Sequence, residues 1–184
     1  ATRPTIDLAG FGSGDGYVIS GEGGRRLGNQ VTMGDINGDG LDELITADQQ
    51  GYIVAVWGKA SRSNISLSAG YNASDVFRMT HYQVSTHRAE RLIDASGDFN
   101  GDGIDDLLVG DPLYDDGAAD SGIVYLVLGR AGATRADVHL HDINGTNGFR
   151  IRATGVANQN LGSSVHFIGD YNGDGYDVIL LGQE

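Results

Sequence analysis

A nine-residue pattern of alternating oxygen-bearing residues occurs three times in this chain of 184 residues. The copies read DINGDGLDE from Asp35, DFNGDGIDD from Asp98 and DYNGDGYDV from Asp170. Each copy has Asp, Asn and Asp at positions 1, 3 and 5, with glycine at positions 4 and 6. Calcium takes about six to eight oxygen ligands, and a tight loop can supply them from alternating residues. The pattern therefore predicts three loops that bind a hard cation.

The formal net charge of −13 comes mainly from these loops. Four, four and three of the 25 Asp and Glu residues lie in the successive copies, and the remaining acids nearly balance the 12 Lys and Arg residues. Clustered carboxylates repel one another, and a divalent ion in each loop would relieve that repulsion. No basic stripe is present, so no nucleic-acid partner is expected. No apolar run approaches the roughly 20 residues of a membrane span, so no membrane insertion is expected.

The similarity among the three copies extends beyond the loops. LGNQVTMGD from Leu27 aligns with LGSSVHFIGD from Leu161, and a short apolar stretch follows each loop. The segments Gly51–Lys59 and Gly122–Arg130 are apolar at successive positions and bounded by glycine, which is typical of strands buried on both faces. No stretch shows sustained helical periodicity. We therefore predict an all-β repeat protein. An ordinary β-sandwich with acidic turns is the competing interpretation, but it would not require the long-range repetition.

Repeats of several tens of residues with about four strands are typical of β-propeller blades. We predict one segment over residues 1–184 that contains about three repeats of four-stranded antiparallel sheets. An outer strand occupies residues 1–21, repeat one 22–84, repeat two 85–155 and an incomplete repeat three 156–184. Propellers typically have about four to eight blades. We therefore expect the remainder of a larger chain to complete the propeller, with self-association of several copies or pairing with another chain as alternatives.

Position 9 of the pattern distinguishes among families of calcium loops. An EF-hand needs a bidentate Glu at position 12 and flanking helices. Position 12 is Thr46, Val109 or Leu181, and apolar strands follow the loops, so the EF-hand is excluded. Dockerin loops are also followed by helices and lie closer together. The first two copies instead have an acid at position 9, Glu43 and Asp106, directly before a strand.

With these features the chain resembles the FG-GAP repeats of the integrin α-subunit β-propeller, and more closely the bacterial proteins built from such repeats. The Leu-Gly pair before the loop, the loop and the strand after it carry the resemblance, which covers essentially the whole chain. It implies that each loop joins two neighbouring strands of one blade and binds Ca²⁺. The implied ligands are the side chains of Asp35, Asn37, Asp39 and Glu43 with the Leu41 carbonyl, those of Asp98, Asn100, Asp102 and Asp106 with the Ile104 carbonyl, and those of Asp170, Asn172 and Asp174 with the Tyr176 carbonyl.

The third loop departs from this pattern. Its position 9 is Val178, which has no side-chain oxygen, and YDVIL looks one residue short beside LDEL and IDDL. Asp177 or a water molecule would have to fill the gap. We predict two complete calcium sites and a third, weaker one, the loss of a charged ligand costing about 1–3 kcal/mol.

The chain shows no catalytic signature. It has no GxSxG, HExxH or Walker motif and no cysteine, so we predict that it is not an enzyme. His139 and His141 would share one face of a strand, and we interpret them as part of an exposed strand, with a second metal site as the alternative. The polar loop Tyr114–Gly122 is either a solvated connector or a rim loop that binds a ligand.

The function that these features and the resemblance imply is calcium-stabilised recognition. We predict a non-catalytic, integrin-α-like propeller module for adhesion or ligand recognition, with a protein or carbohydrate ligand at the loop rim. Millimolar calcium outside cells can fill modest sites, so we expect an extracellular location, secreted or at the cell surface. A lectin-like, carbohydrate-binding propeller is the first alternative, although Trp57 lies in a run that is expected to be buried. An accessory propeller of a secreted hydrolase is the second.

Overall fold

The computed structural model of the chain describes residues 16–21, 23, 26–48, 51–58, 64–67, 75–80, 92–132, 137–153 and 155–183. Residues 1–15 of the predicted outer strand, and Lys59 at the end of a predicted inner strand, lie outside this part. Strands account for the regular structure of the described residues, apart from one 3₁₀ turn, η2, at Leu140–Asp142. The predicted all-β class is confirmed.

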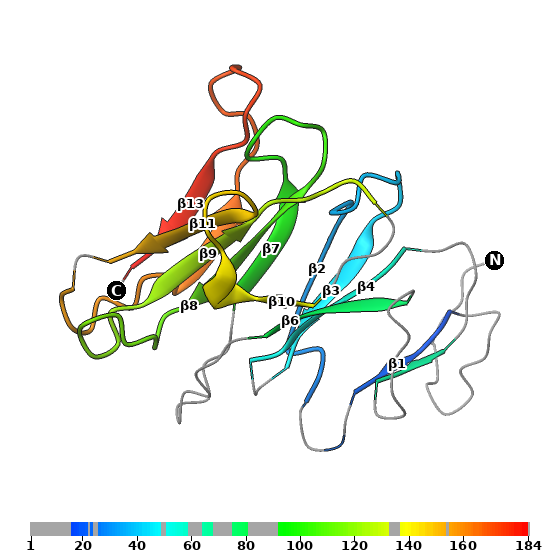
Figure 1. Cartoon of the computed structure of the whole chain (residues 1–184), viewed down its shortest axis with the longest axis horizontal. Coiled ribbons are helices and arrows are strands. Elements are labelled where there is room, and N and C mark those ends of the chain that lie inside the picture. The colour runs from blue at the N-terminus through cyan, green and yellow to red at the C-terminus, as the bar shows by residue number, and fades with distance from the viewer. Residues whose placement is uncertain are drawn as a thin grey trace, which may run out of the picture.

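Three of the four described sheets follow one another along the chain, and we call them blades 1, 2 and 3 (Figure 1). Blade 1 has the order β6-β4-β3-β2, with the short β10 added in parallel beside β6. Blade 2 has the order β11-β9-β8-β7, and blade 3 has the pair β12-β13. The bounds are β2 Gln30–Gly34, β3 Glu43–Ala47, β4 Ile53–Val56, β6 Val76–Thr80, β7 Leu92–Gly97, β8 Asp106–Asp111, β9 Ile123–Val127, β10 Val138–His139, β11 Gly148–Arg152, β12 Ser164–Phe167 and β13 Ile179–Gly182. These are antiparallel propeller blades in an open array, which is the architecture of part of a larger propeller.

Blade 2 buries both of its faces, because its inner strands are apolar at successive positions. Val109 and Tyr125 belong to a core shared with blade 1, whereas Leu108 and Leu126 belong to a core shared with blade 3. All four side chains are 0–1% exposed. Burying a large apolar side chain contributes about 1.5–3 kcal/mol, so the stacked faces stabilise the array.

The predicted burial of Trp57 is confirmed. Its side chain is 5% exposed and lies in the core between blades 1 and 2, where it stacks on Phe77 with ring centroids 5.7 Å apart. Its aromatic face is therefore used by the core.

Two short parallel pairings repeat along the array. Strand β10 lies in the connection between β9 and β11 of blade 2 and pairs in parallel with β6, the outer strand of blade 1. Strand β5 (Ile65–Ser66) lies in the matching connection of blade 1 and pairs in parallel with β1 (Ile19–Ser20). By this correspondence β1 occupies the place of the outer strand of a blade that would precede blade 1.

Candidate metal centre

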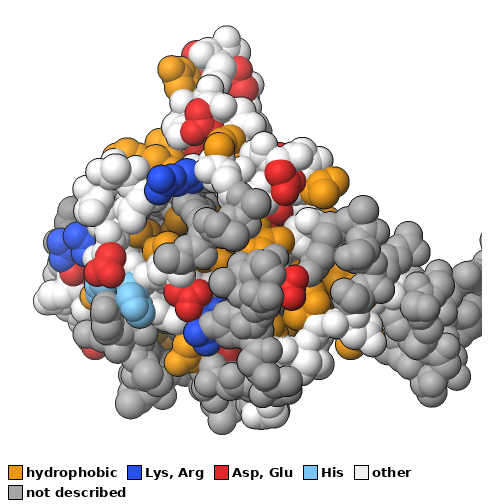
Figure 2. Space-filling model, turned by 45° about the vertical axis from the view of Figure 1, so that its right-hand side comes forward, with side chains coloured by type: hydrophobic (Ala, Val, Ile, Leu, Met, Phe, Trp, Pro, Cys, Tyr) orange, Lys and Arg blue, Asp and Glu red, His pale blue; other side chains and the backbone are white. Residues whose placement is uncertain are grey.

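The three DxNxDG loops lie at the same end of the sheets, each between the first two strands of its blade (Figure 1). The antiparallel pairs that they connect are β2–β3, β7–β8 and β12–β13. Figure 2 shows acidic side chains on the loop that projects at the top of the molecule. The predicted position of each loop within a blade is therefore correct.

The carboxylate at position 1 organises each loop. In the first loop, Asp35 Oδ1 accepts hydrogen bonds from the backbone N–H groups of Gly38 (2.8 Å) and Asp39 (3.1 Å), and Oδ2 accepts one from Gly40 (2.8 Å). The two glycines have φ of 71° and 84°, a left-handed conformation that other residues adopt only with strain. Asp98 and Asp170 accept the same three bonds in their loops.

Positions 3 and 5 continue this arrangement. Asn37 Oδ1 accepts the N–H of Asp39 at 2.9 Å, and Asp39 Oδ1 accepts the N–H of Leu41 at 2.9 Å. The second and third loops repeat both bonds through Asn100 and Asp102, and through Asn172 and Asp174. The structure thus folds the predicted side chains of positions 1, 3 and 5 into one turn in all three loops.

The acid at position 9 is buried beneath its loop. Glu43 is 0% exposed and accepts hydrogen bonds from Ile36 N (3.0 Å), Asn37 Nδ2 (2.9 Å) and Gly58 N (3.1 Å). The partners come from the loop itself and from the residue that follows β4 and Trp57. Position 9 therefore ties the loop to the third strand of the same blade.

Asp106 holds the same place in blade 2. It is 0% exposed and accepts the N–H groups of Phe99 at 2.8 Å and Gly129 at 2.7 Å. Phe99 belongs to the loop, and Gly129 follows the third strand, β9.

Among the residues that the structure describes, no cationic side chain balances the charge of these two buried acids. Burial, together with repulsion from the carboxylates of Asp39 and Asp35, raises the pKa of Glu43 to about 7 despite the lowering effect of its hydrogen bonds from Gly58 and Ile36. Burial likewise raises the pKa of Asp106 to about 6, with Asp98 and Asp102 adding to the effect. No described Lys or Arg forms an ion pair with either acid. A divalent cation would favour the ionised form of both groups.

The donor set fits a hard cation. Each carboxylate oxygen has about two acceptor positions, and each oxygen of Asp106 uses one of them for a backbone N–H. Carboxylate, amide and carbonyl oxygens are the ligands that calcium prefers. Within the described residues, no three Asp, Glu or His side chains lie close enough to hold a metal by themselves. A cation here would depend on the Asn and backbone carbonyl oxygens as well.

The strand register explains the irregular third loop. Thr32 and Phe167 both lie three residues before a loop, and they pair with Ile45 and Ile179. Ile45 is the eleventh residue from the start of its loop, whereas Ile179 is the tenth. The third loop is therefore one residue short, as predicted, and no residue occupies the place of Glu43.

Asp177, which we considered as a replacement ligand, is engaged elsewhere. Its Oδ2 accepts the N–H of Asp98 at 3.0 Å, and its own N–H donates to the Asp98 carbonyl at 3.0 Å. Val178 continues the strand pairing, donating to the Gly169 carbonyl. The third loop thus has no side chain below it that corresponds to Glu43 or Asp106.

Asp177 belongs to a contact between successive loops that the sequence reasoning missed. Asp105, at position 8 of the second loop, makes the same pair of bonds to the first loop. Its Oδ2 accepts the N–H of Asp35 at 2.8 Å, and its N–H donates to the Asp35 carbonyl at 3.1 Å. The signal was present, because all three copies have Asp at position 8: Asp42, Asp105 and Asp177.

The residue at position 7 completes this contact. Ile104 lies against Gly38, where an added Cβ would stand 3.1 Å from its side chain. Tyr176 lies against Gly101 in the same way, 3.0 Å from such a Cβ. We call this the loop interlock: positions 7 and 8 of one loop hold positions 4 and 1 of the loop before it.

The repeated loop, the strands that flank it and the interlock lead directly to the family comparison. The model described as FG-GAP repeat matches residues 94–127, from β7 through the second loop to β9. The chain carries an FG-GAP repeat. The predicted resemblance is confirmed for this family.

Curated relatives of this chain include integrin α subunits. Integrin alpha-PS2 of Drosophila melanogaster is 28% identical over 165 residues, which is 85% of this chain and 10% of that protein. Integrin alpha-V of Gallus gallus is 29% identical over 162 residues, 84% of this chain and 13% of that protein. Integrin alpha-8 of Mus musculus is 29% identical over 164 residues, 85% of this chain and 13% of that protein. The chain spans about a tenth of the length of these relatives, and over that part it is an integrin-α-like β-propeller module.

The HxH pair, His139 and His141, does not form the strand that we predicted. Strand β10 ends at His139, and the chain turns into η2 because Leu140 enters the core at 0% exposure. His139 Nδ1 hydrogen-bonds to Thr80 Oγ1. The ring of His141 instead packs against that of Tyr114, with centroids 5.8 Å apart. The two imidazoles therefore do not lie on one strand face, and neither the exposed-strand nor the metal-site interpretation holds.

The polar loop Tyr114–Gly122 packs against the start of blade 3. Asp116 forms an ion pair with Arg152, and this hydrogen bond lowers the pKa of Asp116. The backbone carbonyls of Ala119 and Asp120 accept N–H groups from the segment that leads into blade 3. The loop is a structured connector.

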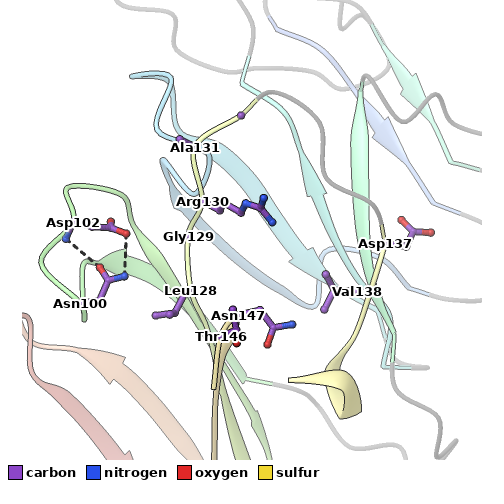
Figure 3. Close-up of a pocket in the computed structure, with 11 residues that line it drawn as sticks. Asn100, Asp102, Leu128, Gly129, Arg130, Ala131, Asp137, Val138, Thr146 and Asn147 are labelled. Atoms are coloured by element: carbon purple, nitrogen blue, oxygen red, sulfur yellow. Dashed lines mark hydrogen bonds between the residues drawn. The ribbon is translucent and has the colours of Figure 1, made fainter. Parts of the chain in front are cut away.

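Two pockets lie beside the loops. One, of about 660 Å³, is lined by polar groups that include Asn100, Asp102 and Asn147, and Arg130 projects into it from the segment after β9 (Figure 3). The other, of about 640 Å³, lies between blades 2 and 3 and contains the aromatic rings of Phe99, Phe149 and Tyr176. In the part of the chain that the structure describes, no helix has the length and apolar character needed to cross a bilayer.

Proposed function

We propose that this chain is a calcium-binding, non-catalytic module of an integrin-α-like propeller, with calcium clamping the loops of blades 1 and 2. The observation that carries the proposal is the buried acid at position 9 of both loops. Glu43 and Asp106 are 0% exposed and face further carboxylates. An unbalanced buried charge is strongly unfavourable, and a divalent cation is the group that would compensate it.

The ligand sets follow from the donors that each loop presents. Asp35, Asn37, Asp39 and Glu43 with the Leu41 carbonyl would hold one ion, and the matching residues from Asp98 to Asp106 a second. Asp170, Asn172 and Asp174 with the Tyr176 carbonyl would hold a third ion more weakly, because that loop has no acid at position 9. Calcium would neutralise the charge of the carboxylates. The chain orients the ligand oxygens through hydrogen bonds that the backbone N–H groups of positions 4, 5 and 6 donate to the carboxylate at position 1.

The structural consequence of calcium would extend beyond the loop. Asp106 accepts hydrogen bonds from Phe99 in the loop and from Gly129 after β9. A cation held by Asp106 would therefore fix the first two strands of blade 2 relative to the third. This is a stabilising role and requires no catalytic group.

We assign the module to recognition outside the cell. The similarity to integrin α subunits supports adhesion or ligand recognition, with a protein as the ligand. Extracellular calcium is abundant enough to fill modest sites, which supports a secreted or cell-surface location. The polar pocket around Arg130 provides a concave surface next to the second loop.

The carbohydrate alternative is less well supported. The groove with Phe99, Phe149 and Tyr176 has the aromatic content of a sugar site. The equivalent place between blades 1 and 2, however, is filled by the chain itself. Arg130 N donates to the Ile36 carbonyl at 3.1 Å, and Ile36, the counterpart of Phe99, is 1% exposed. The groove is therefore explained by blade packing, and Trp57 is buried.

Thermal unfolding with and without calcium tests the proposal. A site filled at 100 times its Kd contributes about 2.7 kcal/mol. One kcal/mol moves the Tm of a domain of this size by about 2–4 °C. Two sites should therefore raise the Tm by about 10–20 °C when calcium replaces EDTA, and magnesium at the same concentration should do less. An unchanged Tm would contradict the proposal.

A variant locates the effect. Asp35→Asn with Asp98→Asn removes one charge from each complete loop, so most of the calcium-dependent rise in Tm should disappear. Asp142→Asn is the matched control, because Asp142 is an exposed acid outside the loops. It should keep the full rise.

A further inference from the structure

Asp106, the buried acid of the second loop, lies at the junction of two connections that both lead to the first loop. One connection is the loop interlock, which runs through its neighbour in the sequence, Asp105. The Asp105 carboxylate accepts the N–H of Asp35 at 2.8 Å, and the Asp105 N–H donates to the Asp35 carbonyl at 3.1 Å. The residue below the second loop is therefore covalently attached to the residue that holds position 1 of the first.

The other connection runs through the segment that follows β9 (Figure 3). In this segment Gly129 donates its N–H to the Asp106 carboxylate at 2.7 Å. Arg130 N and Gly132 N then donate to the backbone carbonyls of positions 2 and 3 of the first loop, both at 3.1 Å. One buried carboxylate of the second loop is thus linked to positions 1, 2 and 3 of the first loop.

The third loop lacks this junction. Asp177 holds Asp98 of the second loop by the same pair of hydrogen bonds, each 3.0 Å long. The next residue, however, is Val178, whose side chain has no oxygen to bind a cation. Asp177 therefore lies beside a single predicted ligand of its own loop, the Tyr176 carbonyl, whereas Asp105 lies between two, at positions 7 and 9.

We propose that the first and second loops bind calcium cooperatively, and that Asp105 and Asp106 link the two sites. This inference rests on the proposed function, because it concerns the calcium ions that these loops would hold. An ion bound to Asp106 restrains both connections, and through them positions 1 to 3 of the first loop, which include two of its ligands. Because those ligands are then already ordered, less conformational entropy is lost when the first loop binds its own ion.

The coupling acts in both directions, because a coupling free energy between two binding sites is reciprocal. Coupling of the usual size changes affinity by between about 5-fold and about 150-fold. Repulsion between the two ions opposes the effect. Packed sheets are about 10 Å apart, however, and the Debye length at physiological salt is about 8 Å, so this repulsion is largely screened at solvent-exposed loops. The ordering of the ligands therefore decides the sign.

Calcium titration followed by NMR tests the proposal on the whole chain. The N–H signals of Gly40, Gly103 and Gly175, at position 6 of the three loops, report on each loop separately. Asp102→Ala removes a ligand of the second loop and should lower the calcium affinity of the first loop by about 5-fold or more. Asp39→Ala, in the first loop, should lower the affinity of the second loop by the same factor.

Two further substitutions separate this coupling from the loss of an acid. Asp174→Ala weakens the third loop and should leave the affinity of the first loop unchanged, because no junction connects the two. Asp142→Ala removes an exposed acid outside the loops and should leave all three affinities unchanged. The ratio of first-loop affinities between the wild type and Asp102→Ala should persist at about 0.5 M NaCl, where repulsion between the ions is screened more strongly.

Hydrogen exchange within one chain distinguishes coupling from structural damage by a substitution. In Asp39→Ala the first loop has lost a ligand, whereas the second loop is intact. Calcium at a concentration that fills only the second loop should slow the exchange of the N–H groups of Asp35, Arg130 and Gly132, which form the two connections to the first loop. Adding Asp105→Ala to this chain should remove most of the protection at Asp35.

The results distinguish a failure of this inference from a failure of the proposed function. A wild type whose loop signals do not respond to calcium would overturn both. In a wild type that binds calcium, three results would each overturn the coupling alone. Asp102→Ala leaves the affinity of the first loop unchanged, Asp174→Ala lowers that affinity as much as Asp102→Ala does, or calcium leaves the exchange of Asp35 in Asp39→Ala unchanged.

Discussion

The acid at position 9 differs from the other loop acids in where it places its charge. Asp39, Asp102 and Asp174 at position 5 are exposed, whereas Glu43 and Asp106 are wholly buried. Solvent can screen the exposed carboxylates but not the buried ones. The buried acids should therefore be the residues whose contribution depends most on the cation.

Asp106→Asn tests this dependence. The amide retains one acceptor oxygen but places an NH₂ group against the other backbone donor, Phe99 N or Gly129 N. We expect a loss of about 1–3 kcal/mol of unfolding free energy in EDTA from that unsatisfied N–H. Calorimetric titration should in addition show calcium affinity at this loop reduced by about tenfold or more, the loss of one charged ligand. Asp142→Asn should leave both quantities unchanged. An Asp106→Asn chain with wild-type calcium binding would remove Asp106 from the ligand set.

At the scale of secondary-structure elements, the strands next to the loops were predictable from sequence and the short parallel strands were not. The stretches around β3, β8 and β9 are apolar at successive positions, which identifies strands buried on both faces. Strands β5 and β10 have only two residues each, too few to show any periodicity. The HxH pair was misassigned because the burial of Leu140 ends β10 at His139, and this burial is a tertiary effect that the local sequence does not show.

The register of β12 and β13 determines how the third loop could be given an acid below it. Val178 lies directly before Ile179, which takes the place of Ile45 in the strand pairing, so Val178 takes the place of Leu44. A substitution at this position would put a carboxylate in the strand and not below the loop. Insertion of one Asp between Asp177 and Val178 restores the missing position.

We expect the inserted Asp to tighten calcium binding at the third loop by about tenfold or more, because one charged ligand is regained. Val178→Asp should change that affinity much less. Insertion of Ala at the same place is the control for loop length. Calorimetric titration of the wild type, the two insertion variants and Val178→Asp checks the prediction. If the Ala insertion tightens calcium binding as much as the Asp insertion does, the effect comes from the length of the loop and not from the added carboxylate.

At the scale of the whole molecule, the loops are a connected series. Position 8 of each following loop holds position 1 of the preceding one, and position 1 accepts the bonds that shape its own loop. The sequence showed the repeated Asp at position 8 but not its partner, because Asp35 and Asp105 are 70 residues apart and only the stacking of the blades brings them together. If calcium ligands are assigned within each loop separately, the residue that positions the first ligand is missed: Asp105 of the second loop positions Asp35 of the first.

Asp105→Ala tests this coupling between blades. The substitution leaves the half-buried N–H of Asp35 without its acceptor, which should lower the free energy of unfolding by about 1–2 kcal/mol. Because Asp35 is position 1 of the first loop, calcium affinity should fall at that loop, although Asp105 belongs to the second. Asp42→Ala is the matched control, since Asp42 holds the same position and is exposed. It should change neither quantity. Denaturant unfolding and calcium titration measure both effects, and an Asp105→Ala chain that weakens only the second loop would show that the loops act independently.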